Sequence, residues 1–183
     1  MAQAWRGTGS GFAEIPSMRM GNGAATQRVR LMTWNGSAFV DRWVKPMTYR
    51  LYSTSTVAGT GTSWLGLAAA NFQADPAYPY TLYSSGLVIP ANVPNYTATI
   101  TGVFTNSGGT PPRYGQGRLL LDGTVIVEGN QATGSPDTST ATWTGTLYPG
   151  AVITAQWRGE GNFFNRPTLQ AGASITAVPA IAA

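Results

Sequence analysis

Residues 95–104 read Asn-Tyr-Thr-Ala-Thr-Ile-Thr-Gly-Val-Phe, and residues 139–147 read Ser-Thr-Ala-Thr-Trp-Thr-Gly-Thr-Leu. Both runs alternate threonine with apolar residues or glycine, which is the period-two pattern of a β-strand with one buried and one wet face. Threonine suits the wet face because its branched Cβ favours an extended backbone while its hydroxyl group meets water. The two runs therefore predict antiparallel sheets whose outer surface consists of threonine rather than charged residues.

The chain from residue 48 onward continues this pattern, and glycine, proline and asparagine are frequent between its runs. Further strands are expected at residues 48–57, 80–89, 118–121, 124–128, 151–157 and 173–178. Asp122-Gly123 separates two of them and is typical of a two-residue hairpin turn. Only residues 65–72 fit a short helix. Strands of this kind predict an all-β fold, an antiparallel β-sandwich of the jelly-roll type.

The segment that precedes the sandwich differs from it in composition. Residues 1–26 are rich in glycine, alanine, serine and methionine without any periodicity, and they predict an extended docking arm. Residues 27–47 predict a β-hairpin that acts as an anchor, because Asn35-Gly36 lies between two strand-like runs and both of its residues tolerate positive φ. Residues 48–183 form the predicted jelly-roll domain.

The composition excludes most catalytic chemistry. Only 10% of the residues are charged, against about 25% in an average soluble domain, and the chain has neither cysteine nor histidine. Zinc fingers, Ser-His-Asp triads, Cys-His nucleophile pairs, haem ligation by histidine and disulfides are therefore excluded. We expect no enzyme, no catalytic residue, no cofactor and no metal. No run of 18 apolar residues occurs, so no membrane span is expected.

Charge is concentrated at the beginning of the chain. Residues 1–50 hold seven basic and two acidic side chains, a net charge of +5, whereas residues 51–183 have a net charge of −1. A basic leading segment suggests docking onto an acidic protein surface. Nucleic acid is not the expected partner, because the arginines are scattered and no recognition motif accompanies them.

The leading segment also carries large apolar residues, which disordered tails rarely do. We therefore expect it to be buried against partner chains. The predicted docking residues are Trp5, Arg6, Phe12, Ile15, Arg19, Arg28, Arg30, Trp34, Phe39 and Trp43.

Aromatic residues between the predicted strands form a second group of candidates. Aromatic side chains are enriched in interface hot spots, and the alternative is that they close the ends of the sandwich. The candidates for receptor or subunit contact are Tyr78, Tyr80, Tyr114, Phe163 and Phe164. Residues 105–117 and 129–137 predict long loops that would present such a surface.

Carboxylates form the third group that we considered. Asp122, Glu128, Asp137 and Glu160 are the candidates for the pair that a glycosidase requires. Asp122 and Asp137 lie in expected turns and Glu128 ends a strand, so these three have a local structural reason to be acidic. A paired-acid site is therefore not the expected use of these residues.

The order of motifs in the second half resembles a known domain family. Leu87-Val88-Ile89-Pro90 leads to the strand at 96–104, the Asp122-Gly123 hairpin, the strand at 141–147, and then Tyr148-Pro149-Gly150 before the last strands. This order resembles the C-terminal half of jelly-roll domains of the C1q/TNF type. The family has an aspartate after the glycine of that last turn, where this chain has Ala151. The resemblance implies a jelly roll that assembles as a homo-trimer.

Residues 31–40, Leu-Met-Thr-Trp-Asn-Gly-Ser-Ala-Phe-Val, resemble a segment common in minor tail and other virion proteins of long-tailed phages, particularly phages of actinobacteria. The resemblance implies a non-enzymatic structural protein at the tail or capsid surface of a virion. A minor tail or tail-tip protein is expected, with other virion proteins as partners. The alternatives are a capsid decoration protein, a carbohydrate-binding module that recognises host cell-surface glycans through Tyr78, Tyr114 or Phe163, and a glycosidase or lyase.

Overall fold

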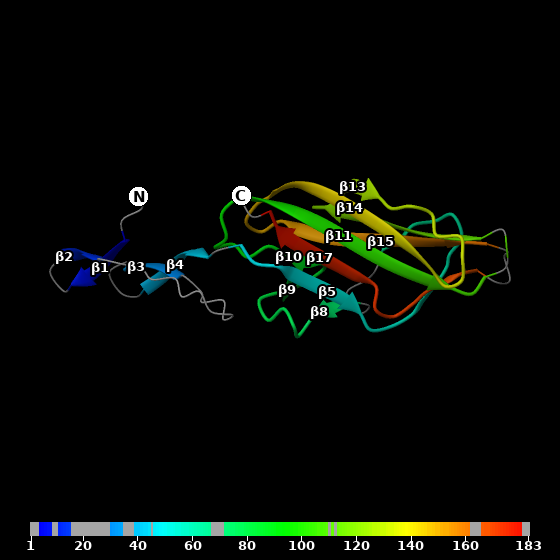
Figure 1. Cartoon of the computed structure of the whole chain (residues 1–183), viewed down its shortest axis with the longest axis horizontal. Helices are drawn as coiled ribbons and strands as arrows, with labels where there is room; N and C mark the ends of the chain where they lie inside the picture. Colours follow the sequence, from blue (N-terminus) through cyan, green and yellow to red (C-terminus); the bar gives the residue numbers. More distant parts are fainter. Residues whose placement is uncertain are drawn as a thin grey trace. The chain divides into compact units, whose positions relative to one another are not determined.

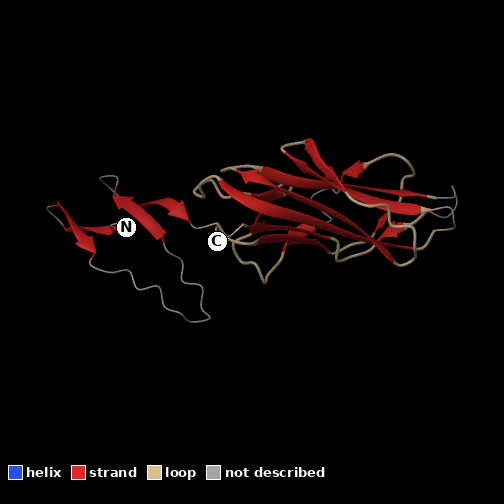
Figure 2. Cartoon of the chain, turned by 45° about the horizontal axis from the view of Figure 1, so that its top comes forward, coloured by secondary structure: helices blue, strands red, loops and turns tan. Residues whose placement is uncertain are grey.

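A computed structural model of the chain describes residues 4–8, 11–15, 30–34, 39–44, 46–66, 72–109, 111, 113–161 and 166–180, with side chains from Pro46 onward. The chain divides into two compact units, Met1–Lys45 and Pro46–Ala183. Both units consist of β-strands, and no helix occurs in the ranges described (Figure 2). Those ranges accordingly contain no helix that is long and apolar enough to cross a membrane.

The first unit contains two antiparallel hairpins. Strand β3 (Arg30–Trp34) pairs with β4 (Phe39–Val44), which confirms the hairpin predicted around Asn35-Gly36; residues 35–38 lie outside the described ranges. Strand β1 (Ala4–Thr8) pairs with β2 (Gly11–Ile15) inside the segment that we expected to be an extended arm. These two strands escaped prediction because their side chains do not alternate in polarity, whereas strand pairing itself needs only backbone groups.

The second unit holds the remaining strands. They are β5 (Tyr49–Ser53), β6 (Val57–Ala58), β7 (Leu65–Gly66), β8 (Phe72–Ala74), β9 (Leu82–Tyr83), β10 (Leu87–Val88), β11 (Tyr96–Ser107), β12 (Tyr114–Leu121), β13 (Thr124–Glu128), β14 (Asp137–Leu147), β15 (Val152–Glu160), β16 (Thr168–Leu169) and β17 (Ser174–Pro179). The short helix expected at 65–72 is wrong at both of its ends, because Leu65–Gly66 and Phe72–Ala74 are strands; residues 67–71 lie outside the described ranges.

These strands form two antiparallel sheets that face each other as a sandwich (Figure 1). The six-stranded sheet has the order β13-β12-β15-β10-β9, with β7 also paired to β15. The seven-stranded sheet has the order β6-β16-β11-β17-β5-β8, with β14 paired to the other side of β11. From β10 onward the chain passes from one sheet to the other between β10 and β11, β11 and β12, β13 and β14, β14 and β15, and β15 and β16. This is the predicted all-β jelly-roll sandwich.

The core lies between the sheets and follows the predicted alternation. Ala98, Ile100 and Phe104 of β11 are completely buried, and so are Ile153 and Trp157 of β15. Each large apolar side chain removed from water contributes about 1.5–3 kcal/mol. The strand faces predicted for 95–104 and 151–157 are therefore confirmed.

Aromatic rings in this core lie over glycines. A Cβ atom on Gly117 of β12 would be 2.0 Å from Cδ2 of Phe104, and one on Gly102 would be 2.7 Å from Cε2 of the same ring. The ring of Trp157 lies over Gly159 in the same way, since a Cβ atom on Gly159 would be 2.3 Å from Cη2 of Trp157. The sheets thus accommodate large rings because glycine leaves room for them.

The hairpin turn between β12 and β13 has the predicted form. Asp122 and Gly123 have φ values of 48° and 80°, so both central residues adopt the positive φ that a two-residue turn needs. The carboxylate of Asp122 accepts a hydrogen bond from the Val152 backbone N–H at 2.9 Å and another from the Tyr148 hydroxyl group. That second bond raises the pKa of Tyr148 above its ordinary value. The Asp122 side chain therefore connects this turn to the first residue of β15 through a hydrogen bond.

Candidate functional site

The predicted docking residues of the first unit lie mostly on its strands. Trp5, Arg6, Phe12 and Ile15 are on β1 and β2, Arg30 and Trp34 are on β3, and Phe39 and Trp43 are on β4, whereas Arg19 and Arg28 lie outside the described ranges. Trp34 and Phe39 are direct partners in the β3–β4 register, and Leu31 is the partner of Trp43. Their contacts with other chains stay a prediction.

The predicted loop aromatics do not share one element. Tyr78 and Tyr80 are half-buried in the turn between β8 and β9. Tyr114 is the first residue of β12 and not a loop residue, since β11 extends to Ser107 and shortens the loop predicted at 105–117. Phe163 and Phe164 lie outside the described ranges.

Each of the four carboxylates considered for catalysis has its own local partner. Glu128 forms an ion pair with Arg118 at 3.3 Å, and Asp122 belongs to the turn described above. Asp137 accepts the backbone N–H groups of Gly134 at 2.9 Å and Thr138 at 2.8 Å, which lower the pKa of Asp137.

Glu160 accepts a hydrogen bond from the Tyr114 hydroxyl group, which raises the pKa of Tyr114. Among the side chains from Pro46 onward that the structure describes, no three histidine, cysteine, aspartate or glutamate residues gather as a metal site would require. The four carboxylates therefore serve turns, strands and ion pairs.

The outer face of the seven-stranded sheet carries threonine at most outward positions of β11 and β14, and we call it the threonine face. Residues opposite each other on paired strands project from the same side of a sheet, and β11 and β14 pair without a bulge. The outward partners are Thr97 with Thr146, Thr99 with Thr144, Thr101 with Thr142, Val103 with Thr140, and Thr105 with Thr138. Strand β17 extends the face with Thr176 and Val178.

Hydrogen bonds between side chains order this face. The hydroxyl groups of Thr99 and Thr144 are 3.0 Å apart, and so are those of Thr105 and Thr138. Cross-strand threonine pairs stabilise a sheet, and they also fix the rotamers of the side chains they join. A surface with fixed rotamers loses less conformational entropy when a partner covers it. Two threonine pairs of this face would therefore lose little conformational entropy if another surface covered them.

The threonine face carries little net charge. The outward residues of β11 and β14 are threonine and valine, and Val178 of β17 leaves 45% of its surface exposed. Arg50 of β5 is the register partner of Thr176, and its guanidinium lies 3.1 Å from the Asp75 carboxylate. A neutral surface can approach a copy of itself without electrostatic repulsion.

One edge of the sheet next to this face is partly blocked. The amide of Asn130 accepts the backbone N–H of Thr140 at 2.7 Å and donates to the backbone carbonyl of Thr138 at 3.1 Å. Since the backbone groups of alternate residues point to the same side of a strand, those of Thr142, Thr144 and Thr146 also face this edge. No described strand pairs with them, so this part of β14 is available for contact.

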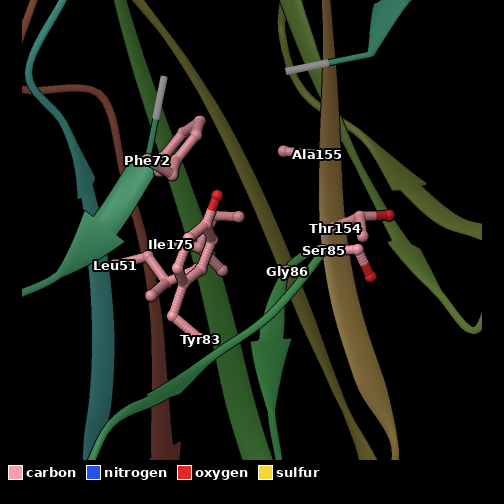
Figure 3. Close-up of a pocket in the computed structure, with 8 residues that line it drawn as sticks. All are labelled: Leu51, Phe72, Tyr83, Ser85, Gly86, Thr154, Ala155 and Ile175. Carbon is pink, nitrogen blue, oxygen red and sulfur yellow. The ribbon is translucent and has the colours of Figure 1, made fainter. Parts of the chain in front are cut away.

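A small pocket between the sheets offers no room for a ligand. It lies between strands of both sheets (Figure 3), and its internal volume of about 10 Å³ is barely that of one water molecule. The residues that line it are Leu51, Phe72, Tyr83, Ser85, Gly86, Thr154, Ala155 and Ile175. This pocket is therefore too small to hold an organic ligand.

The fold is shared with a solved structure. No family model matches the chain, and no curated protein matches it. The chain is similar to the protein in "Structure of Eiger TNF from S. frugiperda", with 9% identity, a TM-score of 0.51, and coverage of 75% of this chain and 94% of that one. At this identity the likeness concerns the fold alone, and the fold is a jelly roll of the TNF type.

Proposed function

We propose that this chain is a non-enzymatic structural component of a phage virion, with a minor tail or tail-tip protein as the preferred assignment and a capsid decoration protein as the alternative. The first unit docks onto other virion proteins at the tail or capsid surface. The jelly roll projects from the particle, assembles as a homo-trimer and makes contacts within the assembly or with the host surface. The threonine face carries this proposal.

The threonine face suits repeated contact between copies. Its residues on β11 and β14 are uncharged, two of its threonine pairs are fixed by side-chain hydrogen bonds, and its threonine methyl groups and Val178 supply apolar area. Charged residues are depleted from the centres of protein interfaces in the same way. These properties favour a second copy of the chain over a charged partner.

The arrangement that we propose is heterologous. The edge of β14 in one copy, with the half-buried Trp143 in its free part, packs against the threonine face of the next copy. Heterologous contacts form closed rings when the rotation between copies allows closure. The resemblance to C1q/TNF jelly rolls favours a ring of three copies.

The assignment to a virion rests on the first unit. Residues 31–40 carry the resemblance to minor tail proteins, and the first fifty residues carry a net charge of +5. A basic, apolar-containing unit that precedes a nearly neutral sandwich is suited to docking onto acidic surfaces of other chains.

Thr142→Arg is expected to convert the trimer into monomers at micromolar concentration. Thr142 is exposed at the middle of the threonine face, beside Thr101, and three buried arginines without partners would make the interface unfavourable. Light scattering coupled to size-exclusion chromatography measures this change. Thr124→Arg, on an exposed position of β13 in the other sheet, is the matched control and should stay trimeric. A monomeric wild-type protein would refute the proposed assembly.

Removal of residues 1–45 is expected to abolish incorporation into particles while the sandwich stays folded, because that sandwich has a complete core of its own. The measurement is an immunoblot of purified particles from cells that express the truncated chain in place of the full chain. Circular dichroism and thermal unfolding of the truncated protein verify folding. Particles that contain the truncated chain at the normal level would show that docking does not depend on the first unit.

A further inference from the structure

The outer face of the six-stranded sheet carries a second, chemically different surface. Trp64, just before β7, lies over two arginines: its ring centroid is 4.1 Å from Cζ of Arg118 on β12 and 4.7 Å from Cζ of Arg158 on β15. Both distances are within the range of a cation–π interaction. We call Trp64, Arg118, Arg158 and the residues that orient them the arginine cluster.

Two glutamine side chains hold the guanidinium groups in place. Oε1 of Gln116, a residue with only 8% of its surface exposed, accepts hydrogen bonds from Nη2 of Arg158 at 2.7 Å and from its Nε at 3.2 Å. Oε1 of Gln156 accepts one from Nε of Arg118 at 2.7 Å. The planar groups are therefore fixed before any ligand arrives, which reduces the entropy lost on binding.

The two arginines differ in their charge balance. Arg118 is paired with Glu128, whereas no carboxylate described by the structure lies within ion-pair distance of Arg158. Glu160 instead accepts the Tyr114 hydroxyl group, and the Tyr114 ring lies 5.4 Å from Cζ of Arg158. A guanidinium has five N–H donors, and the described hydrogen bonds of Arg158 use only those at Nε and Nη2. The positive charge of Arg158 is therefore not balanced by a described carboxylate, and its Nη1 donors make no described hydrogen bond.

Open space adjoins the cluster on the same face. Gly66 is the register partner of Gln156, and Trp64 lies two residues before it, so all three belong to the outward side of the strands. A Cβ atom on Gly66 would meet no described atom within 4 Å. The described atoms therefore leave the surface over Gly66 open, beside Trp64 and next to the glutamine that orients Arg118.

We propose that the arginine cluster binds an acidic saccharide of the uronic-acid class. Its carboxylate pairs with the unused donors of Arg158, and its sugar ring lies over Gly66 beside the indole of Trp64. Charge-assisted hydrogen bonds to a guanidinium are strong and directional. The site is on the sheet opposite the threonine face, so it does not depend on the assembly proposed above, and the failure of one leaves the other testable.

The charges around the cluster favour a single carboxylate over a polyphosphate. Glu128 and Glu160 flank the two arginines, and a nucleic acid backbone with one charge per ~1.7 Å would meet both of them. A uronic acid presents one carboxylate per sugar together with hydroxyl groups. Those hydroxyl groups suit the carboxylate and amide oxygens nearby, which accept hydrogen bonds.

Isothermal titration calorimetry of the full chain with oligogalacturonate at low salt tests this site. Arg158→Gln is expected to weaken binding about tenfold or more, since it removes a charge-assisted contact. Gly66→Phe places a ring in the open space over Gly66 while both arginines are kept, and it is expected to weaken binding similarly. Thr124→Glu lowers the net charge by the same one unit as Arg158→Gln, away from the cluster, and should bind like the wild type. Thermal unfolding verifies that each variant is folded.

Three ligands define the outcomes. Binding of oligogalacturonate together with loss of binding for its carboxyl-reduced, neutral counterpart supports the proposal. Equal binding of the neutral oligosaccharide would overturn the role of the carboxylate. Equal binding of a poly-glutamate peptide would overturn the assignment to a saccharide. Absence of binding by the wild-type chain, or unchanged binding by folded Arg158→Gln, would overturn the site.

Discussion

Replacement of Trp157 with alanine is expected to lower the free energy of unfolding of the sandwich by about 3–5 kcal/mol, the usual cost of removing a large buried aromatic ring. Trp157 lies in the middle of β15, has no exposed surface and packs over Gly159. Its removal leaves a cavity between the sheets that the paired strands cannot close. Chemical denaturation followed by tryptophan fluorescence and circular dichroism measures the change.

Trp157→Phe separates the contribution of the ring from that of its polar atom. The indole N–H of Trp157 is buried and donates no hydrogen bond to the described residues. Phenylalanine therefore loses ring volume but no hydrogen bond, and its cost is expected to be well below that of alanine. Leu82→Ala is the matched control, because Leu82 is 48% exposed and its truncation should change stability by at most about 0.5 kcal/mol. Equal losses for Trp157→Ala and Leu82→Ala would contradict the observed packing.

Gly117→Ala is expected to destabilise the sandwich by about 1–3 kcal/mol through overpacking. The added methyl group would lie 2.0 Å from the Phe104 ring, which is itself completely buried. The ring has no free space to move into, so the two sheets must separate or the ring must leave its rotamer. Thermal unfolding and denaturant titration report the loss.

Two further variants make this prediction specific. Gly66→Ala introduces the same methyl group on a strand where no described atom lies within 4 Å, and it should be neutral or slightly stabilising because alanine restricts the unfolded chain. Phe104→Leu combined with Gly117→Ala should lose less than the sum of the two single losses, since the smaller side chain relieves the overlap. Strictly additive losses would show that the ring does not occupy the space over Gly117.

The long strands could be predicted from the sequence because side-chain alternation reports directly on burial. Residues 95–104 and 139–147 show which side of each strand is wet, and Asp122-Gly123 shows where the chain reverses. The two-residue strands β7 and β16 are too short to display any period, and the single strand expected at 80–89 is in fact two short antiparallel strands, β9 and β10. Strands β7 and β16 exist because the longer strands β15 and β11 offer them backbone partners, which is a tertiary effect.

The surfaces could be predicted only in part. Threonine alternation indicates a wet face, but only the β11–β14 register shows that two such runs are neighbours and that Thr99 bonds to Thr144. The arginine cluster depends on three elements far apart in sequence. An isolated Trp64 among serine, threonine and glycine was the available signal for it, and its meaning appears only with the arginines of β12 and β15 in place.

The Asn130 amide has a consequence for how large an assembly can grow. An uncapped strand edge is a template onto which further chains add without limit, as in fibrils. Here the side chain imitates a neighbouring strand at Thr138 and Thr140, so an incoming strand finds only the remaining length of β14 unoccupied. Strand addition at this edge is thereby restricted to the part of β14 that follows Thr140, and we expect concentrated solutions of the sandwich to stay free of filaments.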